Sequence, residues 1–318
     1  MTREHAAEHD AAPRRRTRGR TAAGTRGEEA HRLLELQRSA GNMAVATAIA
    51  VSRAPAKEPE LTGIGANFAV DQYAGVAQKL RENWARLTPY SRAQMLVTAV
   101  NFELAHVDVP STTFELSDKL PPLNSGEFVA NEKDWTFLLN KAMFTDPSPD
   151  SIDQQGEGSP GLAQTVYHEG RHAEQWFRMA RLKAGSKWKA KVIADWLSIP
   201  VPIAKEAVRH PLKGDGPEAR EAEAWIASIS GGAGEKNAKA EQGADEPQRK
   251  LLAAKAALEK VEADPDASEA DKKKATALVD LWQKRFDEAR AAYLKVPQEA
   301  DAWKVGGRAE SALGKAKH

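Results

Sequence analysis

Apolar residues recur at helical spacing in two neighbouring stretches of the chain, 71–87 and 91–107. Each stretch can bury one apolar face while its polar residues remain in water, which is the pattern of an amphipathic helix. The Thr88-Pro89 step separates the two stretches, because the residue before a proline is disfavoured in the helical conformation. The pattern therefore predicts two helices on either side of this step.

The pattern changes after Pro110, where apolar and polar residues begin to alternate. Residues 113–116, 127–130 and 134–139 follow the two-residue period of strands, and Asn131-Glu132-Lys133 is a turn signal between the last two. Residues 144–158 combine proline, aspartate and glycine without a period, which predicts a loop. We therefore expect an α+β fold, mainly α, with a small antiparallel sheet.

A long helix is expected after this loop. Ser159 can cap it, Pro160 suits the first helical position, and the helical pattern continues to Gly185. Further along, residues 233–249 lack a period and predict a flexible linker. Residues 250–318 predict a helical hairpin that carries no chemical motif.

The composition narrows the chemistry that the chain can carry. The absence of cysteine excludes disulfides, thiolate metal sites and a cysteine nucleophile, so any metal must be held by histidine and carboxylate. The net charge of +1 argues against a dedicated nucleic-acid binder. The longest apolar run, 43–51, is far shorter than the ~20 residues of a membrane span and begins too late for a Sec-type signal.

The first 30 residues are rich in arginine, and no aromatic residue precedes Phe68. Such a segment buries too little apolar surface to offset its chain entropy, so we expect a disordered head over residues 1–30. Binding of nucleic acid or of a membrane surface by these arginines is an alternative to a solvated tail. We expect no specific nucleic-acid partner.

The long predicted helix contains His168-Glu169-Gly170-Arg171-His172, an H-E-x-x-H arrangement. Residues four apart lie on one helical face, so both imidazoles can bind one tetrahedral zinc ion. Glu169 is rotated from His168 by about 100° and can accept a proton from a water that zinc has acidified. The motif therefore predicts a Zn²⁺ site with His168 and His172 as ligands and Glu169 as the catalytic base.

A third ligand is required, because catalytic zinc sites usually have three protein ligands and a water. The metzincin continuation is absent, since Gln175 and Arg178 stand where that family needs a glycine and, later, a histidine. A downstream acid must serve instead. The residues alone leave several candidates for this third ligand: Glu218, Glu221 and Glu223, followed by Asp195 and Asp215.

Two segments resemble known families. LLELQRSAGNMAVA, within residues 31–59, is similar to the leader of toxin-like and peptidase-like proteins associated with bacterial extracellular contractile injection systems. The H-E-x-x-H region together with Glu221 and Ala224, an E-x-x-A pair, resembles gluzincin metallopeptidases. This resemblance implies a zincin-like domain over 60–232, peptide-bond hydrolysis, and Glu221 as the third ligand, with Glu218 and Glu223 as alternatives.

The same resemblance implies a donor for the transition-state oxyanion, for which His210 is the candidate. The expected function is that of a zinc-dependent endopeptidase acting on protein or peptide substrates as an injection-system effector or cargo, with components of that system as partners. It would be made in the bacterial cytoplasm and delivered outside by an injection particle. The alternative is a non-enzymatic passenger or binding protein with a structural or degenerate metal site.

Overall fold

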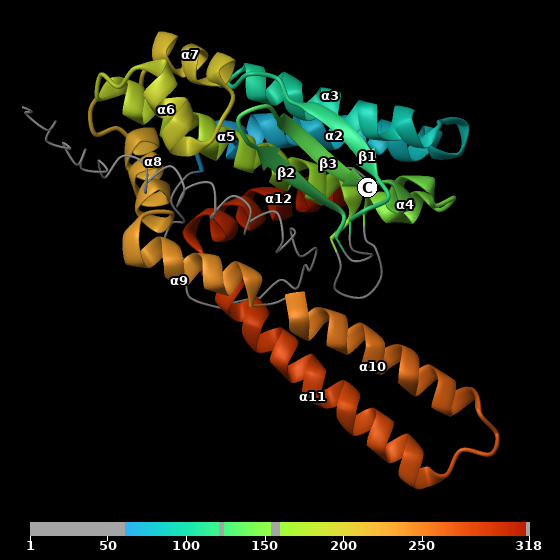
Figure 1. Ribbon diagram of the computed structural model, residues 1–318. Coiled ribbons are helices and arrows are strands. Elements are labelled where there is room, and N and C mark those ends of the chain that lie inside the picture. The colour runs from blue at the N-terminus through green and yellow to red at the C-terminus, as the bar shows by residue number, and fades with distance from the viewer. Residues whose placement is uncertain (1–60, 121–123, 154–159, 244, 316–318) are drawn as a thin grey trace, which may run out of the picture.

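The computed structural model describes residues 61–120, 124–153, 160–243 and 245–315. This part of the chain is mainly helical, with one small sheet (Figure 1). The α-helices are α2 (Asn67–Asn83), α3 (Pro89–Ala105), α4 (Lys141–Thr145), α5 (Leu162–Gly185), α6 (Ala190–Leu197), α7 (Val201–Arg209), α8 (Pro217–Ser228), α9 (Gly231–Gln242), α10 (Asp245–Ala263), α11 (Glu269–Tyr293) and α12 (Pro297–Lys315). The expected head (1–30) and the leader with its linker (31–59) lie outside the described residues and stay predictions.

The sheet consists of β1 (Thr113–Ser117), β2 (Gly126–Ala130) and β3 (Trp135–Asn140) in the order β1-β3-β2. Strands β2 and β3 form the predicted antiparallel hairpin. Its turn is closed by the Asn131 side chain, whose Oδ1 accepts hydrogen bonds from the backbone N–H groups of Lys133 and Asp134. The sheet as a whole is mixed, because β1 pairs with β3 in parallel, so the expectation of a purely antiparallel sheet is wrong.

Helix α5 lies at the centre of the body and is buried from Leu162 to Ala180. It is surrounded by α3, α7, α8 and α12 and by strand β2 (Figure 1). The helix begins at Leu162, with Gly161 as its N-cap, rather than at Pro160. Because helices and a strand cover every side of it, even its polar side chains are removed from water and must find partners within the protein.

The C-terminal third differs from the expectation in two places. Helix α9 occupies much of the segment 233–249 that was expected to be a flexible linker. Helices α10 and α11 form a hairpin that extends from the body as an arm (Figure 1). Helix α12 does not belong to this hairpin, because it returns to the body and packs on α5 and α2, burying Ala302, Val305 and Ala309. The body therefore includes residues well beyond the expected limit at 232.

None of the helices in the described part of the chain combines the length and the apolar character that a membrane crossing needs.

Candidate metal centre

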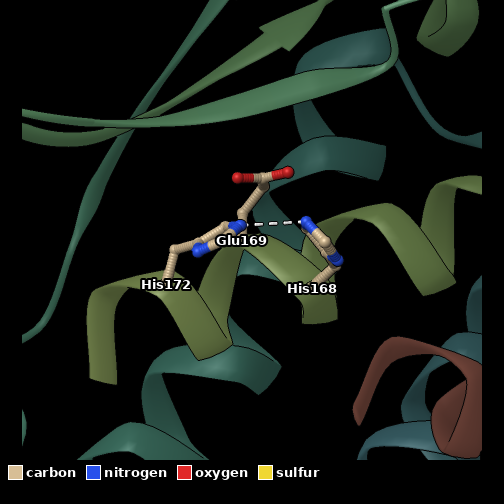
Figure 2. A group of neighbouring side chains, drawn as sticks. All are labelled: His168, Glu169 and His172. Carbon is tan, nitrogen blue, oxygen red and sulfur yellow. Dashed lines mark hydrogen bonds between the residues drawn. The ribbon is translucent and has the colours of Figure 1, made fainter. Parts of the chain in front are cut away.

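The two histidines of the H-E-x-x-H motif face each other on α5. Their Nε2 atoms lie 3.0 Å apart, and the side chains of both residues are almost completely buried. Glu169 lies beside them, as Figure 2 shows, and the three residues form a group that could hold a metal ion. The helical spacing expected from the motif thus brings His168, Glu169 and His172 together.

A carboxylate from α12 lies close to both histidines. Glu299 lies in the first turn of that helix, and its Oε2 is 3.4 Å from His172 Nε2 and 3.6 Å from His168 Nε2. The hydroxyl of Tyr293, at the end of α11, donates a hydrogen bond to the same oxygen at 2.5 Å. Three potential ligand atoms from two helices therefore surround one point.

The charges in this group are strongly coupled. Burial lowers the pKa of His168 to about 4, although Glu299 opposes the shift. Burial also disfavours the charged form of His172, but the nearby Glu299 carboxylate outweighs it and raises the pKa of His172 to about 9. Burial would raise the pKa of Glu299, yet the two imidazoles hold it well below its ordinary value. The imidazole pair therefore favours the anionic form of Glu299.

Glu169 occupies a different environment from Glu299. Its Oε2 accepts a hydrogen bond of 2.7 Å from the backbone N–H of Phe128 in β2. Its Oε1 is buried and has no hydrogen-bond partner within the described residues. Burial raises the pKa of Glu169 to about 8, which places its protonation close to neutral pH. A buried carboxylate with one open oxygen is suited to taking up and releasing a proton.

The carboxylates expected as third ligands lie elsewhere. Glu221 Oε2 is 2.7 Å from Arg178 Nη1 and accepts a hydrogen bond from Thr62, so the expectation that it faces the histidines is wrong. Glu218 lies 3.4 Å from the same guanidinium, and Glu223 is exposed. The reason is geometric, because α8 packs against the C-terminal part of α5, beyond His172. Asp195 pairs with Lys191 on α6, and Asp215 is exposed before α8.

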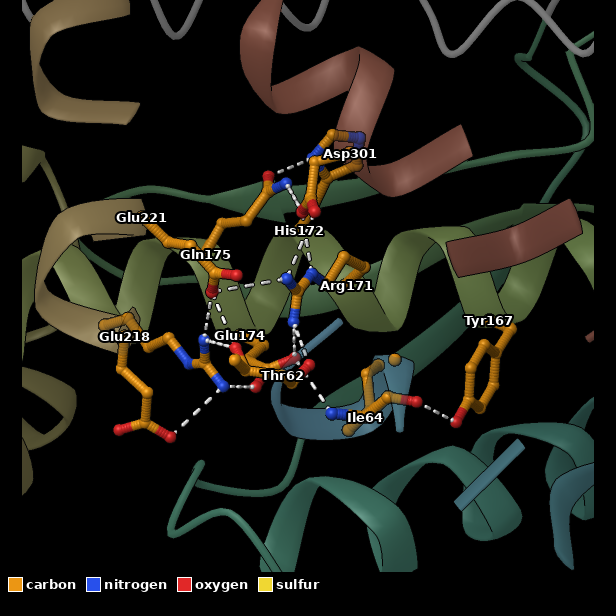
Figure 3. A network of polar contacts seen from close by, with 12 residues as sticks. Thr62, Ile64, Tyr167, Arg171, His172, Glu174, Gln175, Glu218, Glu221 and Asp301 are labelled. Atoms are coloured by element: carbon orange, nitrogen blue, oxygen red, sulfur yellow. Dashed lines mark hydrogen bonds and ion pairs between the residues drawn. The ribbon is translucent and has the colours of Figure 1, made fainter. Parts of the chain in front are cut away.

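Glu218 and Glu221 belong instead to an arginine cluster, a group of ion pairs around two buried arginines of α5 (Figure 3). Arg171 contacts Asp301 through Nε at 2.7 Å and Glu174 through Nη1 at 2.6 Å. Arg178 contacts Glu174 at 2.6 Å and Glu221 at 2.7 Å. Both guanidiniums and Glu174 are buried, so each charge is paired where it is removed from water. The cluster joins α5 to α8, to α12 and to the segment around Thr62.

His210 is not part of the site. It follows α7 on the surface, where its Nε2 lies 3.2 Å from Glu206, and no described contact joins it to the histidine pair. The expectation that it serves the reacting centre therefore has no geometric basis, because α7 ends beside Asp108 and Pro110 on another part of the body. Tyr167 points away from the metal group and donates to the backbone oxygen of Ile64.

The sequence did not identify Glu299 as a carboxylate that lies beside both histidines. A signal for it exists, since Glu299 and Ala302 form the same E-x-x-A pair as Glu221 and Ala224. The pair at Glu221 follows the histidines more closely in the sequence, whereas Glu299 lies beyond the α10–α11 hairpin. Glu221 was favoured because it is nearer in sequence, and the packing of α12 on α5 places Glu299 rather than Glu221 beside the imidazoles.

The site consists of a buried His168–Glu169–His172 group that could hold a metal, with Glu299 facing both imidazoles. Donors of this kind, nitrogen and carboxylate oxygen without sulfur, are those of many catalytic zinc sites. Comparison with known proteins adds no family to this description: no family model, no curated protein and no solved structure matches the chain.

Proposed function

We propose that this chain is a zinc-dependent peptidase in which His168, His172 and Glu299 hold the metal and Glu169 is the general base. The proposal rests on one observation above all. The three facing atoms, two Nε2 and one Oε2, are separated by 3.0, 3.4 and 3.6 Å. A tetrahedral zinc with bonds of about 2.0–2.1 Å requires its ligand atoms to be about 3.3–3.4 Å apart.

The chemistry of the donor set supports the same assignment. Two imidazoles and one carboxylate form the His₂Glu set of known catalytic zinc centres, which leaves a fourth position for water or substrate. When bound, Zn²⁺ lowers the pKa of a water to about 7 and polarises a carbonyl oxygen. Glu299 would supply a negative charge that partly balances the metal, and Tyr293 would hold its carboxylate in place through the hydrogen bond at Oε2.

Glu169 supplies the proton transfers that hydrolysis needs. Its Oε1 is a buried acceptor without a hydrogen-bond partner among the described residues, and we propose that it accepts a hydrogen bond from a water beside the histidines. Its Oε2 is fixed by the N–H of Phe128, so the carboxylate is held in one orientation. We propose that Oε1 takes a proton from the attacking water and passes it to the leaving amine of the cleaved peptide.

Strand β2 offers a place for a peptide substrate. Among the strands of the described residues it lies at the edge of the sheet, with β3 as its neighbour. The N–H of Phe128 points from the other side toward Glu169, so this side faces the histidine helix. An extended peptide that adds to a sheet edge is bound through its backbone, and we propose that a substrate adds to this edge beside Phe128, whose own N–H stays bonded to Glu169.

The burial of the site favours a second candidate. His168, Glu169, His172 and Glu299 are each at most 1% exposed, and a structural site, unlike a catalytic one, needs no position open to a substrate. In that case the metal would stabilise a non-enzymatic passenger or binding protein. The open Oε1 of Glu169 favours the enzyme, because a structural site has no use for a buried carboxylate with an unpaired oxygen.

Glu169→Gln separates the two candidates. The amide keeps the size of the side chain but cannot accept a proton, so the peptidase should retain zinc and lose the cleavage of labelled casein by at least about 100-fold. The matched control is Glu223→Gln, an exposed acid on α8, which should cleave as the wild type does. Equal cleavage by Glu169→Gln and wild type would contradict the proposed base, and zinc-loaded wild type that cleaves nothing would favour the passenger.

A further inference from the structure

Gln175 connects the two helices that carry the proposed ligands. It lies on α5 one turn after His172 and is 1% exposed. Its Oε1 is 2.9 Å from His172 Nδ1. Figure 3 shows this contact as a dashed line between Gln175 and His172. Its Nε2 donates to Asp301 Oδ2 at 2.8 Å and to the backbone oxygen of Gln298 at 2.9 Å, both on α12. One buried amide therefore contacts a histidine on α5 and, on α12, two residues that flank Glu299 in the sequence.

The partners of Gln175 fix the direction of its amide. The carboxylate of Asp301 and the carbonyl of Gln298 can only accept hydrogen bonds, so the NH₂ group must face them. The amide oxygen then faces His172 and can only accept, which requires a proton on Nδ1. Burial would raise the pKa of Asp301, but Arg171 outweighs it and keeps that pKa below its ordinary value, so Asp301 remains an acceptor.

The position of the proton on His172 decides which ring nitrogen can bind a metal. With Nδ1 protonated, the lone pair of the neutral ring is on Nε2, the atom that faces His168 and Glu299. Arg171 extends the connection, because it contacts Asp301 through Nε at 2.7 Å and through Nη2 at 3.1 Å. Arg171 therefore holds the carboxylate of Asp301 in place, and this carboxylate accepts a hydrogen bond from the Gln175 amide.

We propose that Gln175 is a positioning residue: it selects the metal-binding tautomer of His172 and fixes α12 so that Glu299 meets the imidazoles. This inference rests on the proposed metal site for its use, but the tautomer itself can be measured without metal. Outer partners of this kind hold first ligands in orientation, and their loss typically costs about 10–100-fold in metal affinity.

The first test is the tautomer of His172 in the metal-free full-length protein. Imidazole ¹⁵N NMR, recorded at alkaline pH above the pKa of this ring, should show the proton on Nδ1 in the wild type. Gln175→Met keeps the length of the side chain but removes both hydrogen-bonding groups, so a population with the proton on Nε2 should appear. The control is Gln164→Met on the same helix, whose side chain is also buried and whose Oε1 has no partner within the described residues. Unchanged His172 signals in Gln175→Met would overturn the inference.

The second test is metal binding by the same full-length variants. In a competition titration with a chromogenic chelator, Gln175→Met should bind Zn²⁺ about 10–100-fold more weakly than the wild type, and Gln164→Met should match the wild type. The absorption spectrum of the Co²⁺-loaded protein should change in Gln175→Met alone, because it reports the geometry of the ligands. Wild-type affinity and an unaltered Co²⁺ spectrum in Gln175→Met would overturn the inference. A wild type that binds neither ion would overturn the proposed function, and the NMR result would then decide the role of Gln175 by itself.

Discussion

Two short stretches of this chain have almost the same sequence and quite different surroundings. Glu221 to Trp225 reads E-A-E-A-W in α8, and Glu299 to Trp303 reads E-A-D-A-W in α12. Both helices pack on α5. In the first stretch the leading glutamate faces Arg178, and in the second it faces His168 and His172. The side chains that α5 offers, rather than the stretch itself, decide what each carboxylate can do.

The difference has a simple chemical meaning. A guanidinium keeps its proton at any pH that the protein experiences, so Glu221 is paired with a fixed positive charge. An imidazole can release its proton and offer a lone pair, so Glu299 can share a metal ion with its two partners. The end of α5 near Arg178 is therefore expected to serve stability, and the end near His168 to serve chemistry.

Removal of Arg171 should cause the largest loss of stability. Arg171→Met would leave the buried Glu174 with Arg178 as its remaining arginine partner and the partly buried Asp301 without its guanidinium, and breaking a buried pair typically costs about 3–5 kcal/mol. Urea denaturation of the metal-free protein measures this loss. Arg86→Met, on an exposed arginine, should change stability by less than about 0.5 kcal/mol. A loss below about 1 kcal/mol for Arg171→Met would show that the arginine cluster is not a structural centre.

Added zinc should separate the two glutamates. At about 100 times its dissociation constant, zinc should raise the free energy of unfolding of the wild type by about 2.7 kcal/mol, because only the folded protein binds it. Glu221→Gln should keep this gain, and Glu299→Gln should lose most of it. Thermal unfolding with zinc and after chelation measures the difference. The same gain in both variants would remove the contrast on which the assignment depends.

The next largest effect on stability is expected where α12 lies in close contact with α5. A Cβ at Gly306 would lie 3.1 Å from the backbone oxygen of Gln164 and 3.2 Å from the Cβ of His168. Gly306→Ala should therefore push the helices apart and cost about 1–3 kcal/mol, with weaker zinc binding because Glu299 moves too. The neighbouring Gly307→Ala meets only the end of the Gln164 side chain at 4.0 Å and should be harmless. Equal stability of the two variants in urea would contradict the close contact.

The smallest effect is expected for Glu218→Gln. This side chain is 40% exposed and lies 3.4 Å from Arg178, and partly exposed ion pairs of this kind contribute only about 0–1 kcal/mol. Urea denaturation should therefore find a loss below about 1 kcal/mol, and zinc binding should be unchanged. A loss as large as that of Arg171→Met would mean that Glu218 holds the arginine cluster together.

Local features of the fold followed from the sequence, and long-range features did not. The α5 helix and the facing imidazoles depend on helical spacing within a few residues, which the sequence displays directly. The β2–β3 hairpin depends on the turn at Asn131 in the same way. The parallel pairing of β1 and the return of α12 depend on packing between distant segments. The pattern E-A-x-A-W occurs twice in the chain, and the two copies are too alike for the sequence to show which glutamate lies beside the histidines.

The most direct test of the account is the zinc content of the purified full-length protein, measured by mass spectrometry in the wild type and in two matched variants. The wild type and Glu221→Gln should each carry about one zinc per chain, because His168, His172 and Glu299 remain in place. Glu299→Gln should lose the metal after dialysis against a weak chelator. A metal-free wild type, or zinc retained by Glu299→Gln and lost by Glu221→Gln, would contradict the central claim.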